Sequence, residues 1–350
     1  MFKLLCFIVF FLCAIHSQAH HSMAEFDFNT IDEYRGEVIR LNWRNPHVEL
    51  TLMVQDDDGT EFELEVEAQD VNTMSRRGLY PELINIGDVV RIAGHLSRRN
   101  SRLMSVTNVL LTNGTEIRFR GNPQPRWATQ ETETAGFGTV FGSESIEEIH
   151  ANTDLEAGKE MGVFRVWMRA RAGGFPSELP LTASAIEHRQ NWTVADDPNT
   201  TCTVPGMPSS MRINPPHPIE LLQREDGNIT VHVEFFDVFR TVYMDSGIDP
   251  QAQEPSPQGF SLGHWEGETL VVNTTAVNWP YFDNMAQTPL SSSVEIYERF
   301  EPTADGRQLN YLMSVTDPEN FSETITGAWV LDWWPNLEMQ EYDCIPPEHP

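Results

Sequence analysis

Lysine, cysteine and long apolar runs are scarce in this sequence. Lysine occurs only at Lys3 and Lys159, and 52 acidic residues face 23 Lys and Arg, which gives a formal net charge of −29 over 350 residues. So acidic a surface repels nucleic acid, and we expect no nucleic-acid partner. No apolar run is long enough for a spanning helix, so we expect no membrane span. We interpret the acidic surface as an adaptation for solubility.

The first 19 residues predict an export signal. Lys3 precedes an apolar run over residues 4–15, and residues 17–19, Ser-Gln-Ala, form the small-x-small pattern that signal peptidase needs. Cleavage after Ala19 leaves 331 of the 350 residues, starting at His20, and changes the net charge to −30 because Lys3 is lost. We therefore expect a periplasmic or secreted protein.

Two cysteines remain after this cleavage, Cys202 and Cys344. In an oxidising compartment such a pair is most simply one disulfide. Closing so long a loop stabilises the fold by about 5 kcal/mol in the chain-entropy model. The alternative, a redox-active pair, favours close spacing, which is not present here. We expect a structural disulfide.

Residues 20–120 predict an OB-like, five-stranded β-barrel. Short runs of alternating polar and apolar residues indicate strands, and a short helix follows Asp70 and ends at Gly78. Three strands, a helix and two strands is the order of an OB-type barrel. We carry no function over from this fold. The expected strands are residues 37–41, 48–54, 61–66, 87–96 and 103–111.

The remainder predicts a linker and irregular segment over residues 121–200, then a larger antiparallel up-and-down barrel or curled sheet over residues 201–350. Within the irregular segment, residues 143–150 and 181–192 have helical character and 164–171 resemble a strand. Such a barrel can enclose a small ligand. The fold class is therefore all-β with minor α. The strands expected in the second domain are residues 219–222, 229–236, 239–244, 260–264, 269–275, 294–300, 308–315, 324–331 and 338–342.

The predicted mature amino terminus offers a copper site. After cleavage His20 would provide a free amine and an imidazole, and His21 would add an imidazole and a backbone amide, a nitrogen set that suits Cu(II). His47, on the hairpin between the first two strands, is the expected third ligand, and His95 is the second choice. The alternative is that the first residues fray and that His47 only belongs to a turn.

Several motifs resemble a known family. The start Ala-His-His-Ser over residues 19–22, the segment Trp-Arg-Asn-Pro-His over 43–47 and Arg-Arg-Gly over 76–78 look like an exported Gram-negative family of unknown function. Residues 202–208 and 263–272 are similar to the C-terminal β module of larger relatives. The resemblance implies no activity. Relatives often carry a histidine where this chain has residues 291–293, Ser-Ser-Ser, so we expect no histidine site in the second domain.

Catalytic signatures are weak, and we assign no catalytic residue. Residues 259–263 match the Gly-x-Ser-x-Gly elbow of serine hydrolases, but no strand-to-helix turn surrounds Ser261, so we interpret the match as coincidence. The pair Glu298 and Arg299 is more typical of the outside of a strand. Other acid or base candidates on the predicted strands are Asp237, Asp245, His232 and Tyr243, and we expect Trp329, Trp333 and Trp334 in the core and at its rim.

We therefore hypothesise a binding protein whose partner is a small molecule or a metal ion. One alternative is an enzyme that acts on a small hydrophobic substrate inside the second barrel. Another is a purely structural component of the cell envelope.

Overall fold

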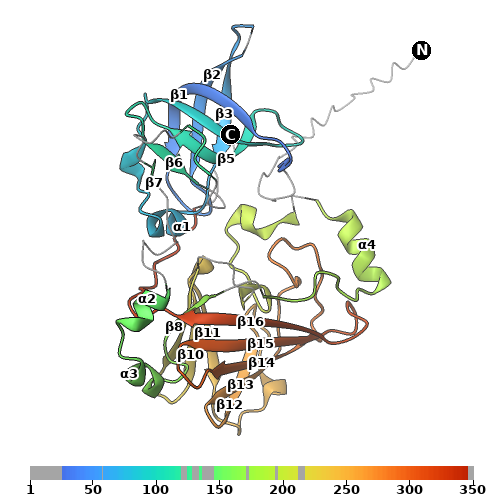
Figure 1. Cartoon of the computed structure of the whole chain (residues 1–350). Coiled ribbons are helices and arrows are strands. Elements are labelled where there is room, and N and C mark those ends of the chain that lie inside the picture. Colours follow the sequence, from blue (N-terminus) through green and yellow to red (C-terminus); the bar gives the residue numbers. More distant parts are fainter. Residues whose placement is uncertain are drawn as a thin grey trace, which may run out of the picture.

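A computed structural model describes residues 26–56, 58–119, 124–127, 134–135, 146–170, 173–193, 196–211 and 217–345. The described chain forms two β-barrels stacked end to end, with helix α1 of the first barrel facing the second (Figure 1). The predicted export signal lies outside the described residues. Within the described ranges, no helix combines the length and the apolar character of a membrane span.

The first barrel confirms the predicted OB-like order. Its sheet runs β3-β2-β1-β4-β5, and a parallel pairing of β3 with β5 closes it. Alternate residues of the strands point into a core that includes Leu52, Leu64 and Ile92, all fully buried. The elements are β1 (Asp32–Asn42), β2 (Glu49–Gln55), β3 (Glu61–Glu67), α1 (Val71–Arg76), β4 (Val89–Leu96) and β5 (Leu103–Leu110), extended by β6 (Glu116–Arg118) and β7 (Thr134–Ala135).

The structure confirms the larger barrel that was predicted for the second domain. Nine strands of the described chain close it in the order β10-β11-β12-β13-β14-β15-β16-β8-β9. Neighbours are antiparallel except β11 and β12, which pair in parallel. The bounds are β8 (Val166–Arg169), β9 (Ile219–Gln223), β10 (Ile229–Val233), β11 (Val238–Tyr243), β12 (Phe260–Glu266), β13 (Thr269–Thr275), β14 (Glu295–Pro302), β15 (Gln308–Thr316) and β16 (Ile325–Trp333).

Residues 121–200 contain more helices and strands than their composition predicts. Strand β8 pairs with β16 and β9 and so completes the second barrel. Helices α2 (Ile146–Ala151) and α4 (Ala183–Asn191) lie where helical character was predicted, and α3 (Leu155–Glu160) packs its buried Gly158 on Trp333. Short 3-10 helices occur at Pro81–Leu83, Pro198–Thr201, Ser209–Met211, Phe235–Asp237 and Pro250–Ala252.

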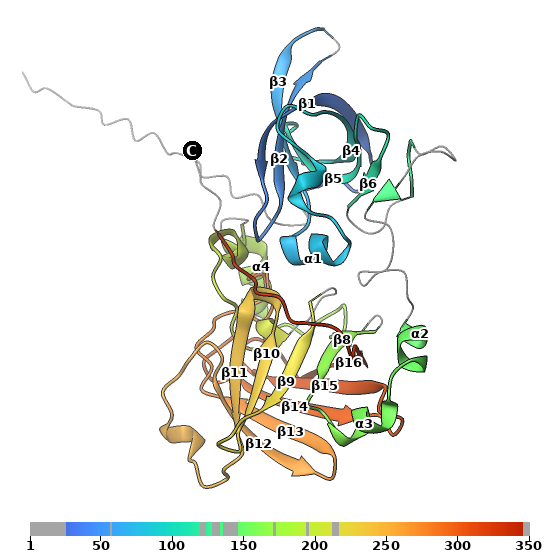
Figure 2. The same ribbon diagram turned by 90° about the vertical axis from the view of Figure 1, so that its left-hand side faces the viewer.

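The predicted last strand, residues 338–342, is wrong. This segment is an irregular tail that runs between the two barrels (Figure 2). Its backbone groups bond to side chains instead of to a strand: the Gln340 N–H donates to Glu234 at 2.9 Å, and the Tyr342 N–H donates to Asp237 at 3.0 Å. Buried backbone groups need partners, and here carboxylates supply them.

Candidate functional site

Of the three residues predicted to bind copper, the structure describes only His47. His20 and His21 lie outside the described residues. The His47 side chain is 23% exposed, and its Nδ1 atom lies 3.6 Å from Oε1 of Glu67. Across the part of the chain that the structure describes, no three His, Cys, Asp or Glu side chains gather as metal ligands would. Copper binding therefore stays a prediction.

Helix α1 is held in place by the motif at residues 43–47. Asp70 caps the helix with its carboxylate. The Val71 N–H donates to Oδ1 of Asn45 at 2.7 Å, and Nδ2 of Asn45 donates to Asn72 at 3.0 Å. Asn45 is buried. This motif residue therefore positions the helix that faces the second barrel.

Four charged side chains meet between the barrels: Asp70 and Arg76 from the first, and His217 and Glu234 from the second. We call them the interdomain ion cluster. Arg76 donates from Nη1 and Nη2 to the two oxygens of Glu234, at 3.0 and 2.5 Å. His217 lies between the carboxylates, 3.6 Å from Asp70 and 3.5 Å from Glu234. None of the four side chains is more than 14% exposed.

Electrostatics keep this cluster ionised. Burial alone would lower the pKa of His217, but Asp70 and Glu234 outweigh it and raise that pKa to about 9. Burial alone would raise the pKa of Asp70, yet the charge and hydrogen bond of His217 hold it well below its usual range. Arg76 and His217 thus lie against the two carboxylates of the cluster. Such a buried cluster connects the barrels and has little capacity left for a ligand.

The carboxy-terminal tail covers the same interface. Nδ2 of Asn72 donates to the carbonyl of Glu341 at 3.3 Å, and the Ile345 N–H donates to the carbonyl of Asn45 at 3.0 Å. The predicted disulfide between Cys202 and Cys344 is confirmed, with the two Cα atoms 5.7 Å apart. It therefore ties the second domain to this tail and not to its last strand.

The interior of the second barrel is packed, and its polar groups bond to one another. Glu298 points inward, where it accepts from Nη1 and Nη2 of Arg240 at 2.5 and 3.0 Å and from the hydroxyl of Tyr311 at 2.7 Å. The expectation that Glu298 and Arg299 form an exterior pair is therefore wrong, because alternation turns only Arg299 outward. Trp329 and Trp333 are buried in the same core, as predicted.

Two further candidates, Ser261 and His232, bond to neighbouring side chains. Ser261 lies within strand β12, is 1% exposed and is bonded to Thr274 at 2.8 Å, so it is no exposed nucleophile. His232 pairs with Asp237 at 3.0 Å and stacks on the ring of Phe239. These contacts give both side chains a structural role.

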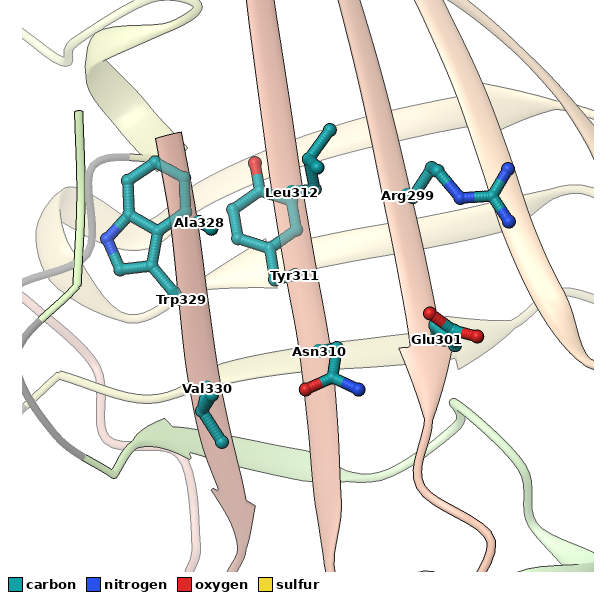
Figure 3. Close-up of a pocket in the computed structure, with 8 residues that line it drawn as sticks. All are labelled: Arg299, Glu301, Asn310, Tyr311, Leu312, Ala328, Trp329 and Val330. Carbon is teal, nitrogen blue, oxygen red and sulfur yellow. The ribbon is translucent and has the colours of Figure 1, made fainter. Parts of the chain in front are cut away.

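A groove crosses the outer face of β14, β15 and β16 (Figure 3). Strand register places two outward rows beside each other: Arg299–Leu312–Ala328 and Glu301–Asn310–Val330. The row between them, Phe300–Tyr311–Trp329, is buried and points into the barrel. The groove has a volume of about 240 Å³. We call the six outward residues of the two rows the outer groove.

The polar side chains of the outer groove retain hydrogen-bonding capacity. Among the residues that the structure describes, Arg299 donates only through Nη1, to Glu266 at 2.6 Å and to the hydroxyl of Tyr297 at 3.2 Å. Glu301 and Asn310 are exposed, and among the described residues neither side chain has a hydrogen-bond or ion-pair partner. Polar groups with free capacity beside an apolar floor are what a ligand site offers.

The sequence alone did not predict the outer groove, because the six residues that form it come from three different strands. Alternation alone shows that Arg299 and Glu301 share one face of β14, and that Asn310 and Leu312 share one face of β15. Register decides that Glu301 lies opposite Asn310 and Arg299 opposite Leu312. A one-residue slip would place different residues together.

Comparison with known proteins supports the resemblance noted in the sequence. Residues 9–105 match the model of a protein family described as a family of unknown function, DUF6152. The match ends within β5, so it covers most of the first barrel and none of the second. No curated protein matches the chain.

Proposed function

We propose that this chain is an exported binding protein that holds a small molecule in the outer groove of its second barrel. The observation that carries the proposal is the combination, in the two rows described above, of polar side chains with spare hydrogen-bonding capacity and an apolar floor. Small-molecule sites commonly combine an apolar surface with a few polar groups.

The rest of the second barrel supports a binding surface on its outside. Its inward side chains form one hydrophobic core, and the charged groups within that core, Arg240 and Glu298, are paired with each other. An enzyme that acts inside the barrel would have to displace this packing.

Binding of the fluorescent probe 1-anilinonaphthalene-8-sulfonate tests this function. The Leu312→Asp variant puts a charge on the groove floor and should weaken probe binding at least about tenfold, or about 1.4 kcal/mol. The matched control is Leu222→Asp, because Leu222 is also an outward leucine, 40% exposed, on strand β9, which contributes no residue to the groove. The proposal fails when both variants bind the probe like the wild type.

Copper binding at His20, His21 and His47 is a second candidate function. The orientation of His47 favours it: Nδ1 is buried and faces Glu67, while part of the ring is exposed. A carboxylate behind a histidine is the usual support for a metal-binding imidazole. The site also requires the amine that cleavage after Ala19 would expose.

Titration of the processed protein with Cu(II) tests the copper site. Mass spectrometry first establishes whether the amino terminus is His20. The His21→Ala and His47→Ala variants should each lower the copper affinity. Equal copper binding by the wild type and both variants would remove these residues from consideration, and a different amino terminus would remove the terminal amine.

A further inference from the structure

The outer groove carries two opposite charges on one strand, and their order indicates a class of ligand. Arg299 and Glu301 are outward residues of β14. At about 3.3 Å per residue along the strand, their Cα atoms are about 6.6 Å apart. They make no ion pair with each other among the described residues. A ligand with two charges of its own can therefore contact both. This inference rests on the proposed function of the same groove.

Part of the Arg299 guanidinium is free to contact an anion. Glu266 and the hydroxyl of Tyr297 bond to its Nη1 atom and hold the guanidinium on the outer face of the sheet. Its Nη2 and Nε atoms have no hydrogen-bond partner among the described residues. A guanidinium edge with two free nitrogen donors matches a carboxylate, which accepts two parallel hydrogen bonds.

Glu301 and Asn310 provide the complementary end. They lie opposite each other on β14 and β15, and both are exposed. The carboxylate of Glu301 and the amide oxygen of Asn310 are acceptors, which suits the several N–H donors of an ammonium group. An anion at this end would meet Glu301, and a cation at the other end would meet Arg299.

Apolar side chains lie beside both charged ends. Leu312 and Ala328 continue the row of Arg299, and Val330 ends the row of Glu301. Ala328 is the smallest side chain of the six. Its size leaves space between Leu312 and Val330 for an apolar group of a ligand.

We propose that the outer groove binds a small zwitterion with an apolar body, with its carboxylate on Arg299, its ammonium on Glu301 and Asn310, and its apolar group on Leu312, Ala328 and Val330. A free amino acid with an apolar side chain is the simplest molecule of this class. A net-neutral ligand also avoids the general repulsion that a chain of net charge −29 exerts on anions.

Isothermal titration of the full chain with L-leucine tests the assignment. N-acetyl-L-leucine lacks the ammonium charge, and L-leucinamide lacks the carboxylate. We expect each of them to bind at least about tenfold more weakly than L-leucine. Arg299→Gln should abolish the preference for L-leucine over L-leucinamide, and Glu301→Gln should abolish the preference over N-acetyl-L-leucine.

The matched control is Glu295→Gln, because Glu295 is an exposed residue of the same strand outside the groove. It should leave all three affinities unchanged. An affinity for L-leucine that Arg299→Gln and Glu301→Gln do not alter overturns the assignment. Groove binding of the fluorescent probe without any L-leucine binding overturns the ligand class alone, whereas loss of both kinds of binding also overturns the proposed function.

Discussion

Glu234 is the residue on which the contact between the barrels depends most. Its carboxylate is fully buried and accepts hydrogen bonds from Arg76, Asn72 and the backbone of Gln340. Each of these groups is itself buried or partly buried, so the loss of a Glu234 carboxylate oxygen would weaken hydrogen bonds to both barrels and to the tail. Single residues at this interface therefore have effects that reach both domains.

We expect Glu234→Gln to lower the free energy of unfolding by about 3–5 kcal/mol, because the two buried cations Arg76 and His217 would then share the single carboxylate of Asp70. Chemical denaturation followed by tryptophan fluorescence measures the change. The matched control is Glu63→Gln. Glu63 pairs with Arg40 at 3.9 Å but is 53% exposed, so its loss should cost no more than about 1 kcal/mol. Equal effects of the two substitutions would contradict the assigned role.

His217 predicts how stability depends on pH. Its pKa is raised to about 9 in the folded state from 6.5, so the folded state binds the proton more tightly. The resulting stabilisation is fully present below pH 6.5 and is lost as the pH rises through about 9. Its size is on the order of 3 kcal/mol. The denaturation midpoint should therefore fall as the pH is raised from 6 to 10.

The His217→Gln variant provides the control for this pH dependence. It removes the titrating group, so the variant should be less stable than the wild type at pH 6 and approach it at pH 10. If the stability of the variant falls with pH as steeply as that of the wild type, groups other than His217 cause the loss of stability at high pH.

At the scale of elements, α3 shows packing overriding helix propensity. Alanine normally stabilises a helix by about 1 kcal/mol relative to glycine. A Cβ atom on Gly158, however, would lie 2.3 Å from Cζ3 of Trp333, whose ring also contacts Arg165. We expect Gly158→Ala to cost about 1–3 kcal/mol in thermal or chemical unfolding.

The reverse substitution at the neighbouring position gives the control. Ala157 is exposed in the same helix, so Ala157→Gly should cost only its helix propensity, about 1 kcal/mol. A Gly158→Ala variant more stable than the wild type would show that Trp333 moves aside readily and that propensity decides.

Alternation predicted most strands because it reports directly which residues share a face. It could not show which face points inward, and so Glu298 was expected outside the barrel although Arg240 accommodates it inside. It also predicted a strand at residues 338–342, where the acceptors are the side chains of Glu234 and Asp237. The outer groove needed register between strands, which no local pattern contains.

At the scale of the whole molecule, the tail and its disulfide join the two barrels. Cys202 and Cys344 are 142 residues apart in sequence, and the tail beside Cys344 contacts Asn45 of the first barrel. In the chain-entropy model so long a loop is worth about 5 kcal/mol, and engineered cases often show less. The cross-link thus restrains the tail at the interface.

We expect the double substitution Cys202→Ser and Cys344→Ser to lower the unfolding free energy by about 2–5 kcal/mol and to make the tail sensitive to protease. Mass spectrometry after limited proteolysis identifies the cleavage sites. Dithiothreitol should have the same effect on the wild type and none on the variant. A wild-type tail that stays protected after complete reduction would show that the ion cluster holds it without the disulfide.

Methyl NMR tests most directly whether the second barrel binds its ligand on the outside. Leu312, Ala328 and Val330 of the outer groove carry methyl groups, as do the interior residues Leu309 and Leu331. Addition of 1-anilinonaphthalene-8-sulfonate to methyl-labelled protein should shift the three groove signals and leave the two interior signals in place. Shifts confined to Leu309 and Leu331 would contradict the claim and place the ligand inside the barrel.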